Sequence, residues 1–245
     1  MTNNTERMKI LGVPVDMVKA AEALEIFKGL MGQSGCSLIV TPNSEIVVNA
    51  TSDPELLSLI ESAELVIPDG IGLVYASRIL KKPLTERVTG IDFLSDILGY
   101  LEATGGSVYL LGGKPGIGEQ AAVNIKGQHP GLKVEGVHHG YFDSGGEGGV
   151  VEDINASGAE FLCVAMGSPK QEKFIDGHRE EFLHIRAAMG VGGSLDVWAG
   201  TLARAPGFFR KHGFEWLYRL YQEPKRFKRV LKLPVFIIKV MFSKK

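Results

Sequence analysis

Short apolar runs that stop at glycine or proline constrain this fold more than any other feature of the sequence. Helical patterns follow several of these runs, for example over Ile71–Leu80 and Gln120–Lys126. Runs this short and this apolar are typical of strands buried on both faces. The alternation predicts an α/β fold with a mainly parallel sheet flanked by helices. The predicted strands are Ser37–Thr41, Leu65–Ile67, Val108–Leu111, Leu132–Val137, Phe161–Ala165 and Ile185–Val191.

Length and composition are typical of a folded globular protein whose cysteines are reduced. A chain of 245 residues allows one large domain, or one domain with an appendage. The two cysteines, Cys36 and Cys163, lie in or beside apolar runs, so we expect buried thiols in a reducing compartment. Strictly apolar stretches such as Leu233–Ile238 are far shorter than the roughly 20 residues of a spanning helix. Met1–Lys9 is polar, and we expect no secretion signal there.

The net charge of −1 hides a division of the chain. Residues 1–203 hold 15 Lys and Arg against 26 Asp and Glu, whereas residues 204–245 hold 12 against 2. We therefore expect an α/β body over 1–203 and a basic C-terminal appendage over 204–245. The appendage either meets an anionic partner, such as a lipid surface or a phosphate, or docks on the acidic body.

The appendage has a helical, amphipathic pattern. Trp216, Leu217, Leu220 and Tyr221 recur at helical spacing. Basic residues beside aromatic and aliphatic ones fit a helix at a membrane interface, and packing on the body is the alternative. Nucleic acid is not expected, because the body is acidic and no recognised binding motif is present. The apolar faces leave a homo-oligomer open. Arginines spaced at i, i+7 and i+10 share a predicted helix face and suit a diphosphate: Arg219, Arg226 and Arg229.

The predicted strands end in polar, glycine-rich segments. Ligands of parallel α/β sheets bind at the carboxyl ends of the strands, and glycine lets a phosphate approach the backbone. Together the segments favour a nucleotide or sugar-phosphate site, although each glycine alone could be an ordinary turn residue. The segments are Thr41–Asn43, Asp69–Gly70, Gly112–Lys114, Gly167–Gln171 and Gly192–Ser194.

Asp69 is the first candidate for a catalytic group. It follows the apolar run Leu65–Ile67 and Pro68, where partial removal from water raises the pKa of a carboxylate toward that of a general base. The alternative is that Asp69 caps the helix after it. Thr41 and Asn43 lie at a neighbouring strand end, where they would either hydrogen-bond a hydroxylated substrate or cap a helix.

A rival motif points to a nicotinamide-dependent oxidoreductase. Gly116, Gly118 and Glu135 fit the spacing of a dinucleotide fingerprint, but Gly112–Pro115 separates the motif from its strand. Metal chemistry is not expected. His138 and His139 are adjacent, so their rings should point apart in a strand, and no third ligand stands at helical spacing.

Several segments, in order along the chain, resemble the WecG/TagA/CpsF family of bacterial glycosyltransferases. They include Glu86–Gly90, Tyr109–Gly113, Gly140–Phe142, Gly190–Gly193, Arg204–Pro206 and Gly213–Arg219, together with the segments around Thr41, Asp69 and Gly167. The resemblance implies a Rossmann-like domain with a membrane-targeting C-terminal appendage. It also implies that the reaction uses no cofactor and no metal.

The resemblance assigns roles to residues. Asp69 would be the base, acting with Thr41, Asn43 and Gln171 in a catalytic set. The arginines of the appendage would hold the acceptor diphosphate. The expected substrate-binding residues are Arg87, Gly112, Gly113, Gly167, Ser168, Lys170, Gly193, Asp196, Arg219, Arg226 and Arg229.

The implied activity is an inverting transfer of N-acetylmannosamine from a UDP donor to undecaprenyl-diphosphate-linked N-acetylglucosamine. The enzyme would be cytoplasmic and peripheral on the inner membrane leaflet, in the synthesis of a cell-surface polymer such as wall teichoic acid. A uronic-acid donor is the alternative within the family. A non-catalytic UDP-sugar or membrane-binding protein is a third class. We also expect full activity to need the appendage, so deletion from about Leu202 should lower turnover on a lipid acceptor.

Overall fold

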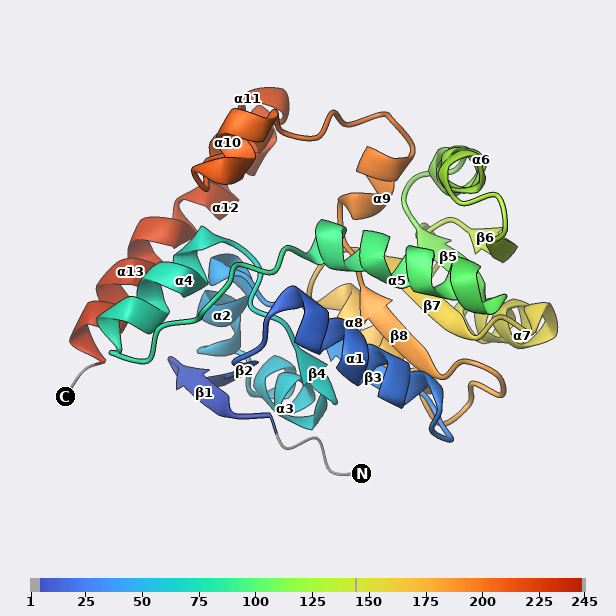
Figure 1. The fold of residues 1–245 in the computed structure, drawn as a ribbon, viewed down its shortest axis with the longest axis horizontal. Coiled ribbons are helices and arrows are strands. Elements are labelled where there is room, and N and C mark those ends of the chain that lie inside the picture. Colours follow the sequence, from blue (N-terminus) through green and yellow to red (C-terminus); the bar gives the residue numbers. More distant parts are fainter. Residues whose placement is uncertain (1–4, 144, 244–245) are drawn as a thin grey trace.

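A computed structural model describes residues 5–143 and 145–243, and the side chain of residue 228 is excluded. At its centre is a six-stranded sheet in the order β4-β3-β8-β7-β5-β6, in which every neighbouring pair is parallel (Figure 1). The expected parallel α/β fold is thereby confirmed. The strands are β3 (Ser37–Val40), β4 (Leu65–Val66), β5 (Ser107–Gly112), β6 (Lys133–His138), β7 (Phe161–Ala165) and β8 (Ala187–Gly190).

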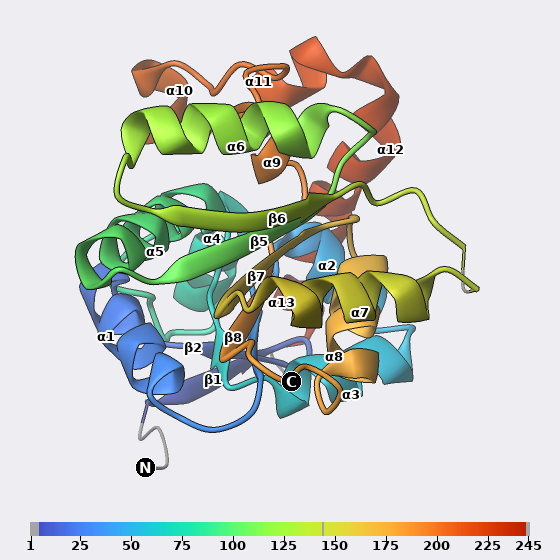
Figure 2. The same cartoon turned by 90° about the vertical axis from the view of Figure 1, so that its right-hand side faces the viewer.

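Helices cover both faces of the sheet, which explains why its inner strands β3, β8 and β7 are almost entirely apolar. Side chains alternate along each strand. Leu38 and Val40 of β3 therefore pack into one core cluster, whereas Ile39 between them packs into the other. Figure 2 shows α1 and α5 on one side of the sheet and α7 and α8 on the other. The helices of the first layer are α1 (Ala20–Met31), α5 (Gly90–Thr104), α6 (Ile117–Gln128) and α9 (Ser194–Trp198). Those of the second are α2 (Ser44–Ala50), α3 (Pro54–Ser62), α4 (Ile71–Ile79), α7 (Glu147–Ser157) and α8 (Lys170–His178).

An antiparallel hairpin of β1 (Arg7–Ile10) and β2 (Val13–Asp16) joins the second layer, and the apolar runs did not predict it. Buried Asp16 attaches the hairpin to the sheet: it accepts hydrogen bonds from Arg7 Nε at 2.6 Å and from the backbone N–H of Val66 at 2.7 Å. This long-range carboxylate contact, which no local pattern reveals, acts together with the burial of Met8, Ile10, Val13 and Val15 in the core.

The appendage folds back on the body. It contains α10 (Gly207–Lys211), α11 (Glu215–Gln222), a 3-10 turn (Pro224–Arg226), α12 (Phe227–Val230) and α13 (Lys232–Phe242). Helix α13 packs on α2 and α4 (Figure 1). Its Phe236 and Val240 are fully buried in the core. The sequence left docking on the body open, and the structure shows it. Within the described residues, no helix is both long and apolar enough to span a membrane.

The prediction that Arg219, Arg226 and Arg229 share one helix face was wrong. The helix that carries Arg219 ends at Gln222, and Pro224 begins a separate 3-10 turn. Proline removes a backbone donor and clashes with the preceding turn, so the chain changes direction there. The three arginines are brought together by this bend rather than by helical periodicity.

The helix α6 offers a test of this packing with a matched control. A Cβ at Gly118 would lie 2.3 Å from Cγ1 of Val137 on β6, whereas one at Gly127 of the same helix would meet nothing within 4 Å. We expect Gly118→Ala to lower the free energy of unfolding by ~1–3 kcal/mol through overpacking. Gly127→Ala should raise it by ~0.5–1 kcal/mol, as alanine does in a helix. Urea denaturation of both variants measures this, and an unchanged midpoint for Gly118→Ala would contradict it.

Candidate active site

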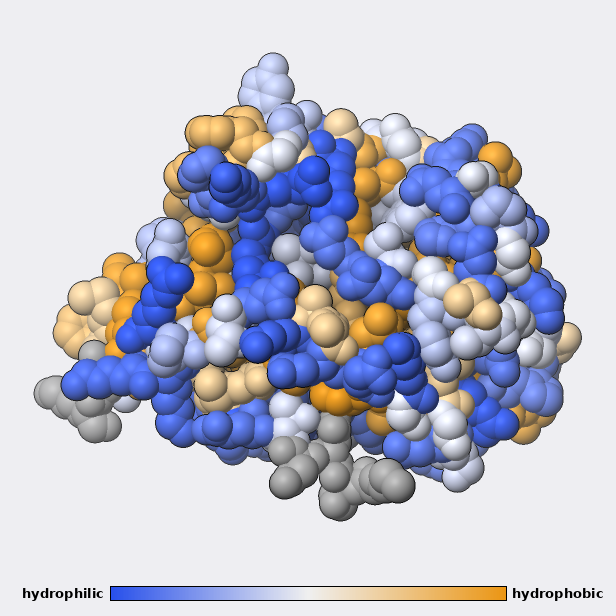
Figure 3. Space-filling view, in the orientation of Figure 1, coloured by the Kyte–Doolittle hydropathy of each residue, from blue (hydrophilic) through white to orange (hydrophobic). Residues whose placement is uncertain are grey.

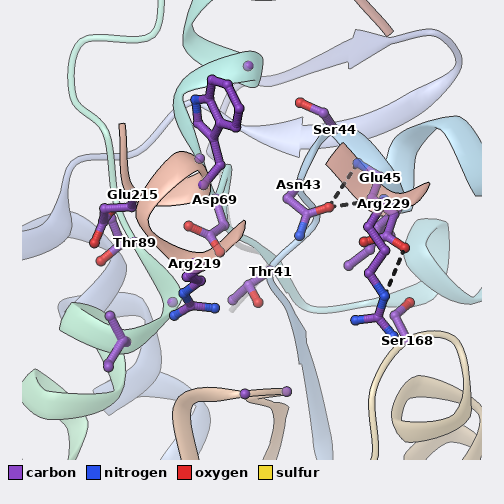
Figure 4. A pocket seen from close by; sticks show the side chains of 18 of the residues that line it. Thr41, Asn43, Ser44, Glu45, Asp69, Thr89, Ser168, Glu215, Arg219 and Arg229 are labelled. Atoms are coloured by element: carbon purple, nitrogen blue, oxygen red, sulfur yellow. Dashed lines mark hydrogen bonds and ion pairs between the residues drawn. The ribbon is translucent and has the colours of Figure 1, made fainter. Parts of the chain in front are cut away.

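A cavity of about 300 Å³ lies at the carboxyl ends of β3, β4, β7 and β8, with the appendage forming its opposite wall. The body contributes the turns that follow these strands, and the appendage contributes residues of α11 and α12 and the turn between them. Figure 4 shows Asp69, Thr41 and Arg219 directed toward the same space. The predicted site residues that line the cavity are Thr41, Asn43, Asp69, Arg87, Gly167, Ser168, Gln171, Gly193, Arg219, Arg226 and Arg229.

Asp69 enters this cavity directly after β4. Its backbone N–H donates to the carbonyl of Pro42 at 3.0 Å, which ties the ends of the neighbouring strands β3 and β4 together. The helix α4 has Gly70 as its N-cap and no side-chain cap, so the capping alternative for Asp69 is wrong. Removal from water raises the pKa of Asp69, while Arg219 and Arg87 partly oppose this effect. A half-buried carboxylate of this kind suits a general base.

Thr41 and Asn43 line the cavity in different ways. Thr41 Oγ1 donates to the carbonyl of Gly190 at 3.4 Å, so Thr41 does not cap a helix. Asn43 is the N-cap of α2, where its Oδ1 accepts from the N–H groups of Glu45 and Ile46 at 2.9 and 3.1 Å. The amide nitrogen of Asn43 points into the pocket (Figure 4). Because its Oδ1 caps α2, the Asn43 side chain is held with its amide N–H groups directed into the cavity.

Gln171 is buried and holds two turns of the site together. Its Oε1 accepts from the N–H of Gly167 at 3.2 Å and from that of Gly192 at 3.1 Å. Its Nε2 donates to Glu172 at 2.8 Å. These contacts join the turns after β7 and β8, so the side chain positions the rim of the cavity.

The three appendage arginines all line the cavity, but they differ in whether a carboxylate pairs with them. Arg226 Nη1 lies 3.1 Å from Oε2 of Glu223, and Arg229 Nε lies 3.7 Å from Oε1 of Glu45. Within residues 5–143 and 145–243, Arg219 has neither an ion pair nor a side-chain hydrogen bond. Burial lowers the pKa of Arg226, and the charges of Arg219 and Arg229 lower it further. The guanidinium groups lie close enough to repel one another. A polyanion bound between them would relieve this repulsion, so the cluster suits a diphosphate.

Arg87 reaches the cavity from the body and is bound by the appendage. Its Nη1 donates to the carbonyl of Arg210 at 2.9 Å, and its Nη2 binds the carboxylate of Glu215. Both side chains of this ion pair are largely buried. The pair closes one edge of the site.

Four predicted substrate-binding residues lie outside this cavity: Gly112, Gly113, Lys170 and Asp196. Gly112 has a positive φ of 129°, and a Cβ there would lie 2.4 Å from the carbonyl oxygen of Ala165, so sheet packing already accounts for this glycine. Lys170 lies over the ring of Phe142, 4.9 Å from its centroid. Burial and the charge of Glu223 raise the pKa of Asp196, which places Asp196 beside the appendage.

The dinucleotide motif lies away from the cavity. Gly118 is explained by its close approach to Val137, and Glu135 lies within β6, an edge strand of the sheet. Cys36 and Cys163 are buried free thiols, as expected, and burial raises the pKa of Cys36 to about 12.

The arrangement of the histidine and acidic side chains bears on whether the chain could hold a metal ion. Among the described residues, no group of three or more His, Cys, Asp or Glu side chains could hold a metal ion. The expectation that the rings of His138 and His139 point apart was wrong, because their centroids are 4.7 Å apart. His138 is the last residue of β6, so the alternation of a strand no longer separates it from His139.

Sequence reasoning missed several residues of the cavity, among them Glu45, Thr89, Glu215 and Trp216. Glu215 carried a usable signal, because it is one of only two acidic residues in the basic segment 204–245. A single acidic residue among many basic ones often forms a specific ion pair, as Glu215 does with Arg87. Glu45 and Thr89 carried no comparable signal.

A half-buried carboxylate facing convergent arginines, at the carboxyl ends of a parallel sheet, defines an α/β enzyme that acts on an anionic substrate. Comparison with known proteins gives the particular class. The sequence model of the glycosyl transferase WecG/TagA/CpsF family matches residues 8–245, and the chain belongs to this family of glycosyltransferases.

The chain is also similar to curated proteins of Staphylococcus aureus named N-acetylglucosaminyldiphosphoundecaprenol N-acetyl-beta-D-mannosaminyltransferase. It is 37% identical to the one from strain MRSA252, over 99% of this chain and 95% of that protein. It is 36% identical to those from strains MW2 and NCTC 8325, with the same coverage. The likeness extends over both the body and the appendage.

The raised pKa of Asp69 predicts a gain in stability when its charge is removed. The folded protein keeps a proton on Asp69 to higher pH than the unfolded chain does, so this group's contribution to stability is lost as pH rises through the folded pKa. Asp69→Asn should therefore raise the melting temperature near neutral pH. A rise of ~2–4 °C would correspond to about 1 kcal/mol in a chain of this size. The difference should shrink toward acid pH.

Asp92→Asn is the control of opposite sign. Burial alone would raise the pKa of Asp92, but hydrogen bonds from Thr89 and Arg204 outweigh burial and lower it. Its ionised form therefore stabilises the fold above the unfolded pKa, and this contribution is lost as pH falls. Asp92→Asn should lower the melting temperature near neutral pH. Shifts of the same sign in both variants, measured by calorimetry, would contradict the assignment.

Proposed function

We propose that this glycosyltransferase moves N-acetylmannosamine from a UDP donor to undecaprenyl-diphosphate-linked N-acetylglucosamine. The names of the staphylococcal relatives, which match almost the whole chain, support this donor sugar and this acceptor. The observation that carries the proposal is the juxtaposition of Asp69 with Arg219, Arg226 and Arg229 in one cavity. The product would serve a cell-surface polymer, such as the linkage unit of wall teichoic acid.

Asp69 acts as the base in the proposed reaction. The acceptor hydroxyl gives its proton to the Asp69 carboxylate while its oxygen attacks the anomeric carbon of the donor sugar. The bond from that carbon to the β-phosphate oxygen breaks on the opposite face, so the configuration inverts and UDP leaves. The hydroxyl of Thr41 and the amide of Asn43 orient the sugar hydroxyls beside this carboxylate.

The arginines stabilise the charge that develops on the phosphates. UDP departs as a polyanion, and the acceptor brings a second diphosphate. Arg219 is the cation available for the leaving group, because no acidic side chain among the described residues pairs with it. Arg226 and Arg229 lie further along the appendage, where they bind the acceptor diphosphate. In this assignment, arginines of the appendage bind both the departing UDP and the acceptor diphosphate. Their charges, rather than those of a bound metal ion, stabilise the two anions.

A second donor within the same family is the uronic acid of N-acetylmannosamine. Its extra carboxylate would need a cation of its own near the sugar, and Arg87, the cavity arginine that the body contributes, is already bound to Glu215. This pairing and the relatives' names favour the neutral sugar.

The appendage also supports a proposal about membranes. Figure 3 shows hydrophobic residues gathered over the edge formed by the appendage. While Phe236 and Val240 of α13 face the core, Ile238 and Phe242 on its other side are 54% and 76% exposed. The same helix carries Lys232 and Lys239, and basic residues beside apolar ones are typical of helices that lie in an anionic interface. We place the enzyme on the inner face of the cytoplasmic membrane, where a polyprenyl acceptor presents its diphosphate.

A transfer assay tests the base. UDP release would be measured with UDP-N-acetylmannosamine and a lipid-diphosphate N-acetylglucosamine analogue, in the presence of EDTA. The wild type should release UDP only when acceptor is present. Asp69→Asn should lower kcat by ~10²–10⁴-fold, the usual contribution of a general base. If the variant kept most of its activity, Asp69 would not be the base; if the wild type were inactive with this donor but active with the uronic-acid donor, the proposed sugar would be wrong.

Sedimentation with vesicles tests the membrane surface without truncating the chain, since deletion would remove Phe236 and Val240 from the core. We expect Ile238→Ser/Phe242→Ser to lose most of its binding to phosphatidylglycerol vesicles, with little change in melting temperature. Leu183→Ser is the control, because Leu183 is 70% exposed on the loop between α8 and β8. Equal binding by the double variant and the control would refute the proposed surface.

A further inference from the structure

The ion pair between Arg87 and Glu215 joins the body to the appendage at the edge of the active site. Arg87 precedes α5, and Glu215 is the first residue of α11, 128 positions further along the chain. Their side chains are 19% and 17% exposed, so water screens the pair only weakly. Glu215 is thus an acid that the basic appendage keeps beside the catalytic cavity.

Two contacts from the appendage fix the guanidinium of Arg87. Nη2 binds the Glu215 carboxylate, and Nη1 donates to the carbonyl of Arg210 at 2.9 Å. The remaining nitrogen, Nε, is buried and has no hydrogen-bond partner in the part of the chain that is described. Arg87 and Glu215 also line a second cavity, on the side of Arg78 and Arg210, so the pair forms part of the wall between the two cavities.

Three charged groups act on the carboxylate of Asp69. Burial disfavours its ionised form most strongly, Arg219 and Arg87 favour that form, and Glu215 disfavours it. Arg87 and Asp69 line the same cavity, so an arginine released from Glu215 would be free to pair with Asp69. An ion pair there would occupy the base and weaken it.

We propose that Glu215 is a positioning residue for glycosyl transfer: by binding Arg87, it holds that guanidinium against the appendage and keeps it from forming an ion pair with Asp69. This inference rests on the proposed function. The arrangement leaves Asp69 as a free base, beside Arg219, which pairs with no acidic side chain in the described part of the chain. It also makes the base dependent on the docked appendage, because the residue that restrains Arg87 comes from α11.

The pH dependence of kcat/KM distinguishes this role from a merely structural one. In the wild type, kcat/KM should fall on the acid side as Asp69 becomes protonated. Glu215→Gln removes a negative charge near Asp69 and releases Arg87, so the pKa of Asp69 should fall and this acid limb should move to lower pH. The rate on the plateau should drop by about tenfold, because the base is weaker and is paired. Glu215→Asp, which keeps the charge, should restore much of the wild-type profile.

Two comparisons make the test specific. Glu223→Gln removes the other acid of the appendage, which pairs with Arg226, and it should leave the position of the acid limb unchanged. In an Arg87→Gln background, adding Glu215→Gln should change the plateau rate by less than about twofold, because no guanidinium remains to be restrained.

The outcomes separate the inference from the proposed function. A lower plateau with an unmoved acid limb in Glu215→Gln would overturn the positioning role and leave a docking role only. An equally large loss in the Arg87→Gln background would show that Glu215 does not act through Arg87. Absence of transfer by the wild type with this donor and acceptor would instead overturn the proposed function.

Discussion

The packing of α13 on α2 and α4 is the interaction on which the site depends. Phe236 and Val240 leave water and enter the core that the second layer of helices builds on the sheet. Their burial stabilises the docked appendage by several kcal/mol, at ~1.5–3 kcal/mol for each large apolar side chain. Because α10 to α12 lie between the body and α13, docking also fixes the arginines at the carboxyl ends of the strands. The catalytic cavity therefore has one wall from each part of the chain.

Burial and charge act on Asp69 in opposite directions, and their balance suits a base. Without the arginines, burial would favour a neutral carboxylic acid that could not accept a proton. With a guanidinium paired directly, the carboxylate would hold its charge too firmly to take one. The structure lies between these extremes, because Arg87 is engaged by Glu215 and the charges of Arg219 and Arg87 only partly oppose the effect of burial.

Much of the body could be predicted from sequence. Strands buried on both faces have a local signature, since each apolar run must end where a turn begins, and the six predicted strands match β3 to β8. Asp69, Thr41 and Asn43 could be predicted as a group, because carboxyl ends of neighbouring parallel strands meet at one edge. The β1–β2 hairpin could not, because its strands are short and its attachment includes the long-range contact between Asp16 and Val66. The roles assigned to all the site residues remain predictions, and Gly112, Gly113, Lys170 and Asp196 lie outside the cavity.

The sequence by itself determined the parallel α/β class, the position of Asp69 at a strand end and the basic character of segment 204–245, because each follows from local composition and order. Only the tertiary structure decided how the appendage meets the body. Pro224 ends the helix on which the arginine spacing was based, and the bend, not the periodicity, directs Arg219, Arg226 and Arg229 into one cavity. The partnership of Arg87 with Glu215 spans 128 residues, and a contact of that range exists only once both parts have packed.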